Sequence, residues 1–402
     1  MSDRRVLYMA AFLRALATGM IGVLIAIYLA KRGFSLSETG TVVSAGLFGA
    51  ASAAIVVTLG GNRLGSRRVL ILLAILGGVG GLVVAFAHSL HIIVAAAFVG
   101  MVNGMGRDRG PSLIIDQAIL PVTASDQERT LAFAWYNVLQ DLGHALGGLA
   151  AGFPVLLQHT GWFDEVASLK TSVVIYAGIV GATAIVYSRL SRHCERRPTE
   201  SARISKESRK ILWRISSLFG LDSLAGGFLT AALLAYFFFE RFGVSIGAVG
   251  ALFFGARIAN AISHLGAAWL ARRIGLVNTM VFTHIPSSLL LITVAFAPNF
   301  PVAAVLFLLR EGLVEMDVPT RQSYVMAVVR PQERMFASGI THLVRLSAWA
   351  IAPAFAGMLM QTASLAIPLY IGAGMKIAYD VALYVLFRRE RPPEEQVNIH
   401  TC

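Results

Sequence analysis

Charged residues and cysteines are scarce in this sequence. Only 14% of its 402 residues are Asp, Glu, Lys or Arg, while 56% are hydrophobic, and its two cysteines are Cys194 and Cys402. A soluble domain of this length does not need so much apolar surface, so the composition favours a bundle that crosses a membrane several times. Neither cysteine has a second Cys or His at a metal-binding spacing, and we expect both to face a reducing compartment without a disulfide.

Motifs of enzymes and of ATP-driven pumps are also missing. The chain has no phosphate-binding Gly-Lys-Ser/Thr loop, no nucleophile elbow and no metal-binding triad. We therefore predict that the protein is not an enzyme, that it needs no cofactor or metal, and that ATP hydrolysis does not drive it.

Long apolar segments dominate what is present. The mean hydropathy is +0.69, and several segments exceed the roughly 20 residues that cross a bilayer. They lack the alternation of a membrane β-barrel, so we predict an all-α membrane protein with twelve transmembrane helices. The first segment is too long for a signal-peptide core and is expected to be retained. The predicted spans are residues 6–30, 39–57, 69–87, 92–119, 131–157, 168–188, 211–239, 245–271, 276–297, 301–327, 335–361 and 365–387.

The net charge of +12 follows the predicted topology. Of the 34 Lys and Arg, 22 lie in the termini, the even-numbered loops and the start of the seventh span, against four on the opposite side of the membrane. Cytoplasmic loops carry such an excess, so we predict an integral protein of the cell (inner) membrane with both termini in the cytoplasm. The basic charge then reflects orientation in a lipid bilayer and indicates no nucleic-acid partner.

An internal repeat divides the chain into two halves. An offset of 208 residues pairs Arg14 with Asp222, each inside an apolar span, and an offset of 205 pairs Gln117 with Gln322. A basic, polar segment between the halves is typical of a flexible cytoplasmic linker. We divide the chain into an N-terminal six-helix bundle, a linker, a C-terminal six-helix bundle and a cytoplasmic tail, which are residues 1–190, 191–210, 211–388 and 389–402.

Two six-helix units in the same orientation resemble the major facilitator superfamily of secondary transporters. That family carries a cytoplasmic signature after its second helix, roughly Gly-x-x-x-Asp-Arg-x-Gly-x-Arg, which matches this chain at Asn62, Arg63, Gly65 and Arg67. The resemblance implies a gating role for these four residues, although Asn62 stands where the family has an acid and cannot form its ion pair. It also implies a monomer that binds a small-molecule substrate, with helices one, four, seven and ten at the centre.

Four glycines follow one another at close spacing in the fifth span: Gly143, Gly147, Gly148 and Gly152. Small residues at this spacing let two helices approach closely, and this is the favoured interpretation. The same glycines partly match a Gly-x-x-x-Gly-Pro motif of family antiporters, without its proline. The resemblance to exporters therefore gains modest support.

Polar residues inside the spans gather on the helices that the resemblance places in and around the centre. A charge within the bilayer costs about 3 kcal/mol or more, so such a residue usually faces a partner or a wet cavity. In the fifth span the polar residues share one helical face, because they recur at intervals of three and four. The predicted substrate cavity comprises Arg14, Asn137, Gln140, His144, Arg257, Asn260, Arg310, His342, Arg345 and Trp349.

The fourth span carries three consecutive charges, Arg107, Asp108 and Arg109. On a continuous helix their side chains fan through about 200°, so at least one is expected to pair with a neighbouring helix. The triplet lies among Gly104, Gly106, Gly110 and Pro111, which predicts a kinked or loosened helix.

Other charges have structural interpretations. Asp116 and Arg321 lie near the inner ends of their spans, where an interfacial position is as well supported as a buried one. Lys376 and Asp380 are four residues apart in the twelfth span, so we expect them to neutralise each other.

We predict a proton-coupled secondary transporter that moves a small organic solute by alternating access, with a lean to export. Burial opposes the charged form of a carboxylate and a nearby Arg favours it, so a change of access can load and release a proton. The predicted proton-coupling residues are Asp222, Asp141 and Glu311. Arg14 is the expected counter-ion of Asp222, and Arg257 the expected partner of Asp141.

Two alternatives remain. An importer of a small organic anion would use Arg14, Arg257 and Arg345 as an anion clamp. A membrane sensor would bind a ligand in the same cavity without transport. The inner helices hold seven basic and seven acidic residues, which favours neither a dedicated cation site nor a dedicated anion site.

Overall fold

A computed structural model describes residues 2–108, 110–123, 129–191, 205–316, 321 and 334–387. Every regular element in these ranges is a helix, and nine segments among them are long and apolar enough to cross a membrane. They correspond to nine of the predicted spans, and the fourth, fifth and tenth are not among those found in the described residues. The prediction of an all-α membrane protein is confirmed.

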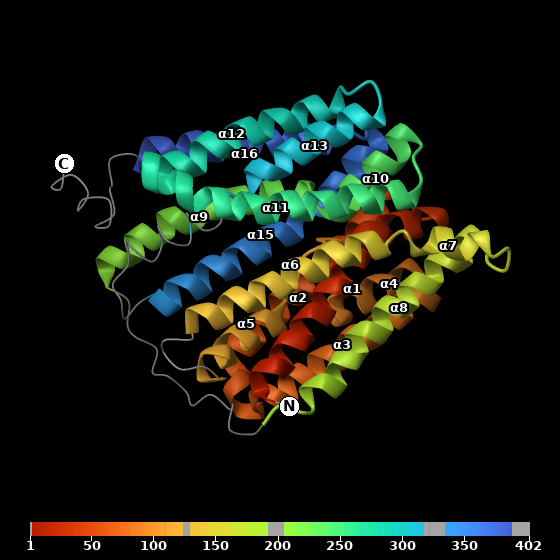
Figure 1. The fold of residues 1–402 in the computed structure, drawn as a ribbon, viewed down its shortest axis with the longest axis horizontal. Helices are drawn as coiled ribbons and strands as arrows, with labels where there is room; N and C mark the ends of the chain where they lie inside the picture. The colour runs from red at the N-terminus through yellow and green to blue at the C-terminus, as the bar shows by residue number, and fades with distance from the viewer. Residues whose placement is uncertain are drawn as a thin grey trace. The chain divides into compact units, whose positions relative to one another are not determined.

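The first compact unit comprises Met1–Pro198, Leu229–Phe254 and Ala350–Leu365. Within it α1 packs against α2, α6, α8 and α10, while α3 packs against α4 and α8 (Figure 1). Leu7, Tyr136 and Tyr187 belong to its buried core. Its helices are α1 (Asp3–Lys31), α2 (Leu36–Leu64), α3 (Ser66–Phe86), α4 (Leu90–Gly100), α5 (Pro111–Ile119), η1 (Leu120–Thr123), α6 (Arg129–Ala150), α7 (Phe153–His159), α8 (Glu165–Tyr187) and α10 (Ala231–Phe242).

The second compact unit comprises Thr199–Phe228, Gly255–Trp349 and Ala366–Cys402. In this unit α12 packs against α13 and α16, and α16 packs against α9 (Figure 1). Phe219 and Tyr379 belong to its core. Its helices are α9 (Lys206–Phe228), α12 (Leu276–Ala295), α13 (Phe300–Val314) and α16 (Ile367–Phe387).

Two long helices contribute residues to both units: α11 (Ile246–Ile274) and α15 (Arg334–Thr362). The division by compactness therefore differs from the division by sequence repeat, because the second-half segments Leu229–Phe254 and Ala350–Leu365 belong to the first unit. The domain boundaries drawn from the repeat remain a proposal about sequence organisation.

The fourth predicted span is broken between α4 and α5. Residues 101–108 and Gly110 are not helical, and Gly106 has a φ of 71°, which glycine adopts without steric cost. Pro111 then begins α5, where its missing N–H is harmless. The predicted loosening is confirmed. The expected fan of Arg107 and its neighbours around a continuous helix is wrong, because Arg107 and Asp108 lie outside any helix.

The seventh predicted span is also interrupted, at residues 229–230, so the expectation of one helix over 211–239 is wrong. Thr230 caps the N-terminus of α10, since its hydroxyl accepts a hydrogen bond of 3.4 Å from the backbone N–H of Leu233. The backbone N–H of Ala232 donates to the carbonyl oxygen of Gly104 at 2.9 Å. One donor near the second break is therefore satisfied by one acceptor in the first, inside the first unit, as a membrane interior requires.

Glycines let α1 and α6 approach each other closely. A Cβ atom added to Gly147 would lie 2.2 Å from the carbonyl oxygen of Leu16, and one added to Gly19 would lie 2.5 Å from that of His144. Gly143 is similarly crowded by the backbone of α1. These contacts confirm the close-packing interpretation of the fifth-span glycines.

Part of the family signature has a backbone explanation. Gly65 joins α2 to α3 with a φ of 80°, and Gly275 joins α11 to α12 with a φ of 86°. An L-residue with a side chain is strained there, so glycine is needed for the turn. Arg67 donates a hydrogen bond to the carbonyl oxygen of Ser188. The side chains of residues 62 and 63 lie outside the described part, and the gating role stays a prediction.

Candidate functional site

A buried arginine organises the first unit. Arg14 on α1 is 7% exposed and forms ion pairs with two carboxylates. Its Nη2 lies 2.7 Å from Oδ2 of Asp116 on α5, and its Nε lies 2.9 Å from Oδ2 of Asp108 in the broken segment. Asp116 is fully buried within the first unit, and its depth in the membrane stays a prediction. Burial of a charge is tolerated only when it is paired and hydrogen-bonded, and this arginine meets that condition.

Three further side chains complete what we call the Arg14 cluster: Tyr136 and Gln140 from α6, and Tyr187 from α8. The hydroxyls of Tyr136 and Tyr187 donate to Asp116 at 2.9 Å and 3.1 Å. The amide of Gln140 donates to Asp108 at 3.3 Å, and the guanidinium of Arg14 donates to Tyr187. The cluster thus ties α1, α5, α6, α8 and the broken segment together.

The side chain of His144 binds the backbone of the broken segment. The backbone N–H of Asp108 donates to Nε2 of His144 at 2.7 Å. Because Nε2 accepts this bond, it carries no proton in this arrangement. His144 therefore positions the chain at Asp108, and its predicted place in a substrate cavity stays a prediction.

A second buried cluster surrounds Asp222 on α9. Its Oδ1 lies 2.8 Å from Nζ of Lys376 on α16, and its Oδ2 lies 3.1 Å from Nη1 of Arg321 and 4.0 Å from Nη2 of Arg345. Asp222, Arg321 and Lys376 are each less than 9% exposed. Arg321 is therefore a buried partner of Asp222, and its depth in the membrane stays a prediction. Three cations stabilise the ionised form of one carboxylate here.

The Asp222 cluster continues to α12. Lys376 lies 3.3 Å from Nε2 of His284, and Nδ1 of His284 lies 2.9 Å from Oδ1 of Asp380. An ammonium only donates, so Nε2 accepts and Nδ1–H donates to the carboxylate. The expected neutralisation of Lys376 by Asp380 is thus wrong. Lys376 forms its ion pair with Asp222, and the carboxylate of Asp380 is hydrogen-bonded to His284.

The two clusters occupy equivalent positions of the repeat with their charges exchanged. Asp222 follows Arg14 by 208 residues, and Arg321 follows Asp116 by 205, the two offsets of the repeat. The first unit joins its first helix to its fourth span by Arg14–Asp116, and the second joins the equivalents by Asp222–Arg321. The expected pairing of Arg14 with Asp222 is wrong, since each has its ion-pair partners within its own unit.

Three of the predicted site residues, Asn260, Arg310 and Glu311, contact one another in the second unit. Asn260 on α11 donates to Oε2 of Glu311 on α13 at 2.5 Å, and Arg310 forms an ion pair with Oε1 of the same carboxylate. Arg345 donates to the hydroxyl of Ser223 at 3.1 Å and stacks on the ring of Trp349 at 4.7 Å. Arg345 therefore lies beside both an aromatic face and the Asp222 carboxylate.

For the remaining predicted site residues, the structure gives the burial of the side chain. Asn137 is exposed, while Asp141, Arg257 and His342 are partly buried. Their roles stay predictions. Sequence reasoning passed over the hydroxyl of Tyr187, and it assigned no site role to Asp108, His284, Lys376 or Asp380. The signal for the lysine and the two aspartates was their charge within a span; the tyrosine had none beyond its place near a helix end.

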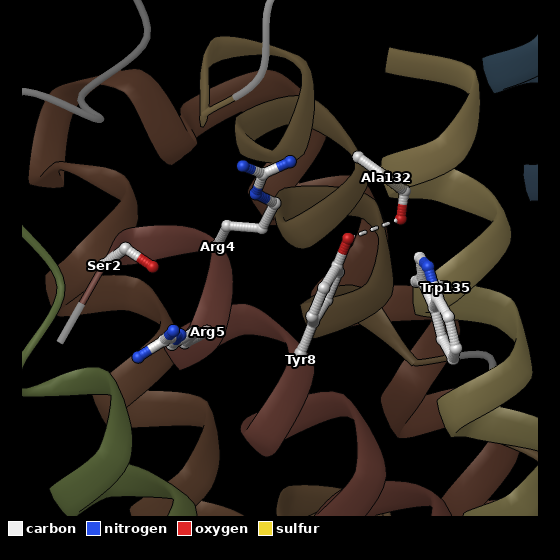
Figure 2. Close-up of a pocket in the computed structure, with 6 residues that line it drawn as sticks. All are labelled: Ser2, Arg4, Arg5, Tyr8, Ala132 and Trp135. Carbon is white, nitrogen blue, oxygen red and sulfur yellow. Dashed lines mark hydrogen bonds between the residues drawn. The ribbon is translucent and has the colours of Figure 1, made fainter. Parts of the chain in front are cut away.

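A separate pocket of about 540 Å³ opens between the N-terminus of α1 and the start of α6 (Figure 2). Its floor includes Tyr8, whose hydroxyl donates to the carbonyl oxygen of Ala132 at 2.9 Å. Trp135 lines this pocket and is 53% exposed, whereas its neighbour Tyr136 turns into the Arg14 cluster. The pocket is lined by Ser2, Arg4, Arg5, Tyr8, Ala132 and Trp135.

Removal of Lys376 tests whether the Asp222 cluster stabilises the fold. Lys376→Met removes a cation that contacts both Asp222 and His284, so we expect it to lower the free energy of unfolding by about 3–5 kcal/mol. Lys31→Met is the matched control, because the Lys31–Glu165 pair has side chains that are 35% and 41% exposed. That change is expected to cost less than about 1 kcal/mol. Thermal unfolding of both purified variants in detergent measures the difference, and equal stabilities would contradict the expectation.

Comparisons with known proteins agree with this architecture. A model of the Major Facilitator Superfamily matches residues 7–309 and 217–400. The uncharacterized membrane protein YJR124C of Saccharomyces cerevisiae is 24% identical over 420 residues, which cover 96% of this chain and 94% of the yeast protein.

Solved structures show the same fold at low identity. The nucleoside transporter NupG has a TM-score of 0.76 and 14% identity, covering 97% of this chain and 100% of NupG. A bacterial homologue of the human lysosomal transporter Spinster, in an inward-facing conformation, has a TM-score of 0.67 and 15% identity, covering 95% and 94% of the two chains.

Proposed function

The chain belongs to the major facilitator superfamily, and from this premise we propose that it is a proton-coupled transporter of a small organic solute that favours export. Membership makes the protein a secondary transporter of the membrane and not an enzyme. Proton coupling, substrate and direction are the proposed parts. We also propose that it works as a monomer in the cell membrane, with both termini in the cytoplasm, because its basic residues follow the positive-inside rule.

Buried carboxylates inside the spans support proton coupling. In the first unit one arginine, Arg14, lies between the carboxylates of Asp108 and Asp116. In the second, Asp222 and Glu311 are 4% and 6% exposed and are held by bases. Ionisable groups of this kind are costly within a bilayer and mark ion or proton pathways in pumps and transporters. This concentration of buried acids is the observation on which the proposal depends.

The charges around the clusters favour a solute without a strong net charge. The first unit places two acids around one base, while the second places Lys376, Arg321 and Arg345 around Asp222. Neither sign of charge prevails over the two clusters taken together, which supports a zwitterion or a weakly charged molecule as the proposed solute.

The anion-import alternative loses one of its three arginines. Arg14 makes contacts to Asp108, Asp116 and Tyr187 and is engaged on Nε, Nη1 and Nη2. It cannot clamp a substrate anion without giving up these partners. A sensor without transport gains no support from any contact in the clusters.

Transport by purified protein in proteoliposomes tests the proposal. A pH gradient is imposed, and uptake is measured for a panel consisting of a nucleoside, a dipeptide, 5-aminolevulinic acid and an aromatic organic anion. We expect several-fold faster accumulation of at least one solute when the gradient is present, and a loss of that gain when a protonophore is added. Accumulation that is equal with and without the gradient would contradict proton coupling, and a gain limited to the organic anion would favour the import alternative.

A further inference from the structure

We propose that Asp108, in the non-helical segment between α4 and α5, is the residue that binds the coupled proton. This inference rests on the proposed proton coupling and adds a specific binding atom, Oδ1 of Asp108. The sequence had favoured Asp222, Asp141 and Glu311 for this role.

The Arg14 cluster holds one more acid than base. Among the contacts described for the cluster, Arg14 is the cation that contacts Asp108 and Asp116, and the other side chains that bond them are the neutral Tyr136, Gln140 and Tyr187. With both acids ionised, the cluster would carry a net charge of −1 in a buried site. A buried charge without a partner is unfavourable, and uptake of one proton removes it.

The hydrogen bonds show which acid is better suited to hold the proton. Asp116 accepts from Arg14, Tyr136 and Tyr187, and these donors stabilise its ionised form. Asp108 accepts only from Arg14 and Gln140 among the described residues, and both bonds end on Oδ2. Its Oδ1 therefore has no donor in the described part of the chain, although the side chain is only 6% exposed. A proton on Oδ1 leaves the bonds to Oδ2 in place.

Charged, titratable and polar groups from α1, α5, α6 and α8 face Asp108. Arg14 faces it from α1, Asp116 from α5, and Gln140 and His144 from α6. Tyr136 on α6 and Tyr176 on α8 also interact with its charge. Arg107 and Arg109 flank it in the sequence. Protonation would weaken its attraction to Arg14 and leave the arginine paired with Asp116.

The backbone at Asp108 is suited to respond to this change. Asp108 is not helical, Gly106 and Gly110 lie two residues to either side, and the backbone N–H of Asp108 donates to His144. Asp222, in contrast, lies on a helix and is surrounded by three cations that stabilise its ionised form. Unwound segments of transporter helices form ion sites in the same manner.

Infrared spectroscopy of the purified full-length protein tests the assignment without a substrate. A pH titration is followed through the C=O stretching band of protonated carboxylic acids, for wild type, Asp108→Asn and Asp164→Asn. Asp164 is an exposed N-cap residue of α8, which makes it a matched control. We expect Asp108→Asn to lose the intensity of one titrating buried carboxyl, while Asp164→Asn keeps it. Retention of the band in Asp108→Asn, or its loss in Asp222→Asn instead, would overturn the proposal.

Transport provides the second measurement. Asp108→Asn is expected to abolish the gain from a pH gradient but to retain gradient-free exchange of the same panel solute, and Asp108→Glu is expected to restore part of the gain. Gradient-driven uptake by Asp108→Asn at the wild-type rate would overturn the assignment to Asp108. No gradient effect in wild type would instead contradict the proposed function, while the infrared titration still decides whether Asp108 binds a proton.

Discussion

Arg14→Met is expected to lower the free energy of unfolding by about 3–5 kcal/mol, since it removes one partner of a buried ion-pair network. The substitution removes the guanidinium that lies between Asp108 and Asp116, and it removes the bond to Tyr187. Thermal unfolding in detergent, followed by size-exclusion chromatography of the heated sample, measures this loss. Stability within about 1 kcal/mol of wild type would show that the arginine contributes no more than an exposed pair.

Exchange of the two charges distinguishes a specific ion pair from general damage to the core. Arg14→Asp alone places three carboxylates together, and Asp116→Arg alone places two guanidinium groups beside Asp108, so each single variant is expected to be severely destabilised. The double variant Arg14→Asp/Asp116→Arg should recover more than half of that loss. The second unit joins the equivalent positions with this polarity, Asp222 on α9 and Arg321 in the tenth predicted span. A double variant no more stable than either single variant would contradict the equivalence of the two pairs.

The exchanged polarity gives the two units different responses to a proton. In the first unit, protonation of Asp108 neutralises the excess of acid and leaves a pair between Arg14 and Asp116. In the second unit, the cations around Asp222 oppose its protonation and maintain the tie between α9 and α16. The proposed proton site therefore belongs to the Arg14 cluster, while the ion pairs of the Asp222 cluster do not depend on that proton.

Hydropathy alone was sufficient for the fold class, because each apolar segment long enough to span a bilayer must satisfy its own backbone as a helix. The break in the fourth span was also predictable, since three glycines and a proline cannot sustain a regular helix around Asp108. The break at Thr230 was not, because one threonine in an apolar segment gives no such signal. It is stabilised by a bond to Gly104, a residue far away in the sequence.

Pairing of the charges could not be predicted from their positions along the chain. Arg14 and Asp222 are equivalent in the repeat, so each occupies the same position in its own half. This equivalence does not imply a contact between the two residues. The partners depend on helix rotation and on the broken segment that carries Asp108. The repeat also aligns Asp116 with Arg321, and each of these residues pairs with the first-helix residue of its own half.

Gly147→Ala is expected to destabilise the protein by about 1–3 kcal/mol, although it adds a single methyl group. The added Cβ would lie 2.2 Å from the carbonyl oxygen of Leu16, and a backbone atom cannot move aside as a flexible side chain does. The helices α1 and α6 would have to separate, which lengthens the contacts of Tyr136 and Gln140 with the Arg14 cluster. We expect Gly147→Ala to lower the pH-gradient-driven uptake as well as the unfolding temperature.

Gly178→Ala in α8 is the matched control, because a Cβ at Gly178 meets nothing within 4 Å. Alanine is the better helix former, so this change is expected to be neutral or to stabilise the protein by up to about 1 kcal/mol. The contrast separates close packing from helix propensity, since both variants gain the same propensity and only one meets a neighbour. Unfolding temperatures that rise together in the two variants would show that α1 and α6 tolerate a wider spacing. That result would contradict the dependence of the Arg14 cluster on the close contact of these helices.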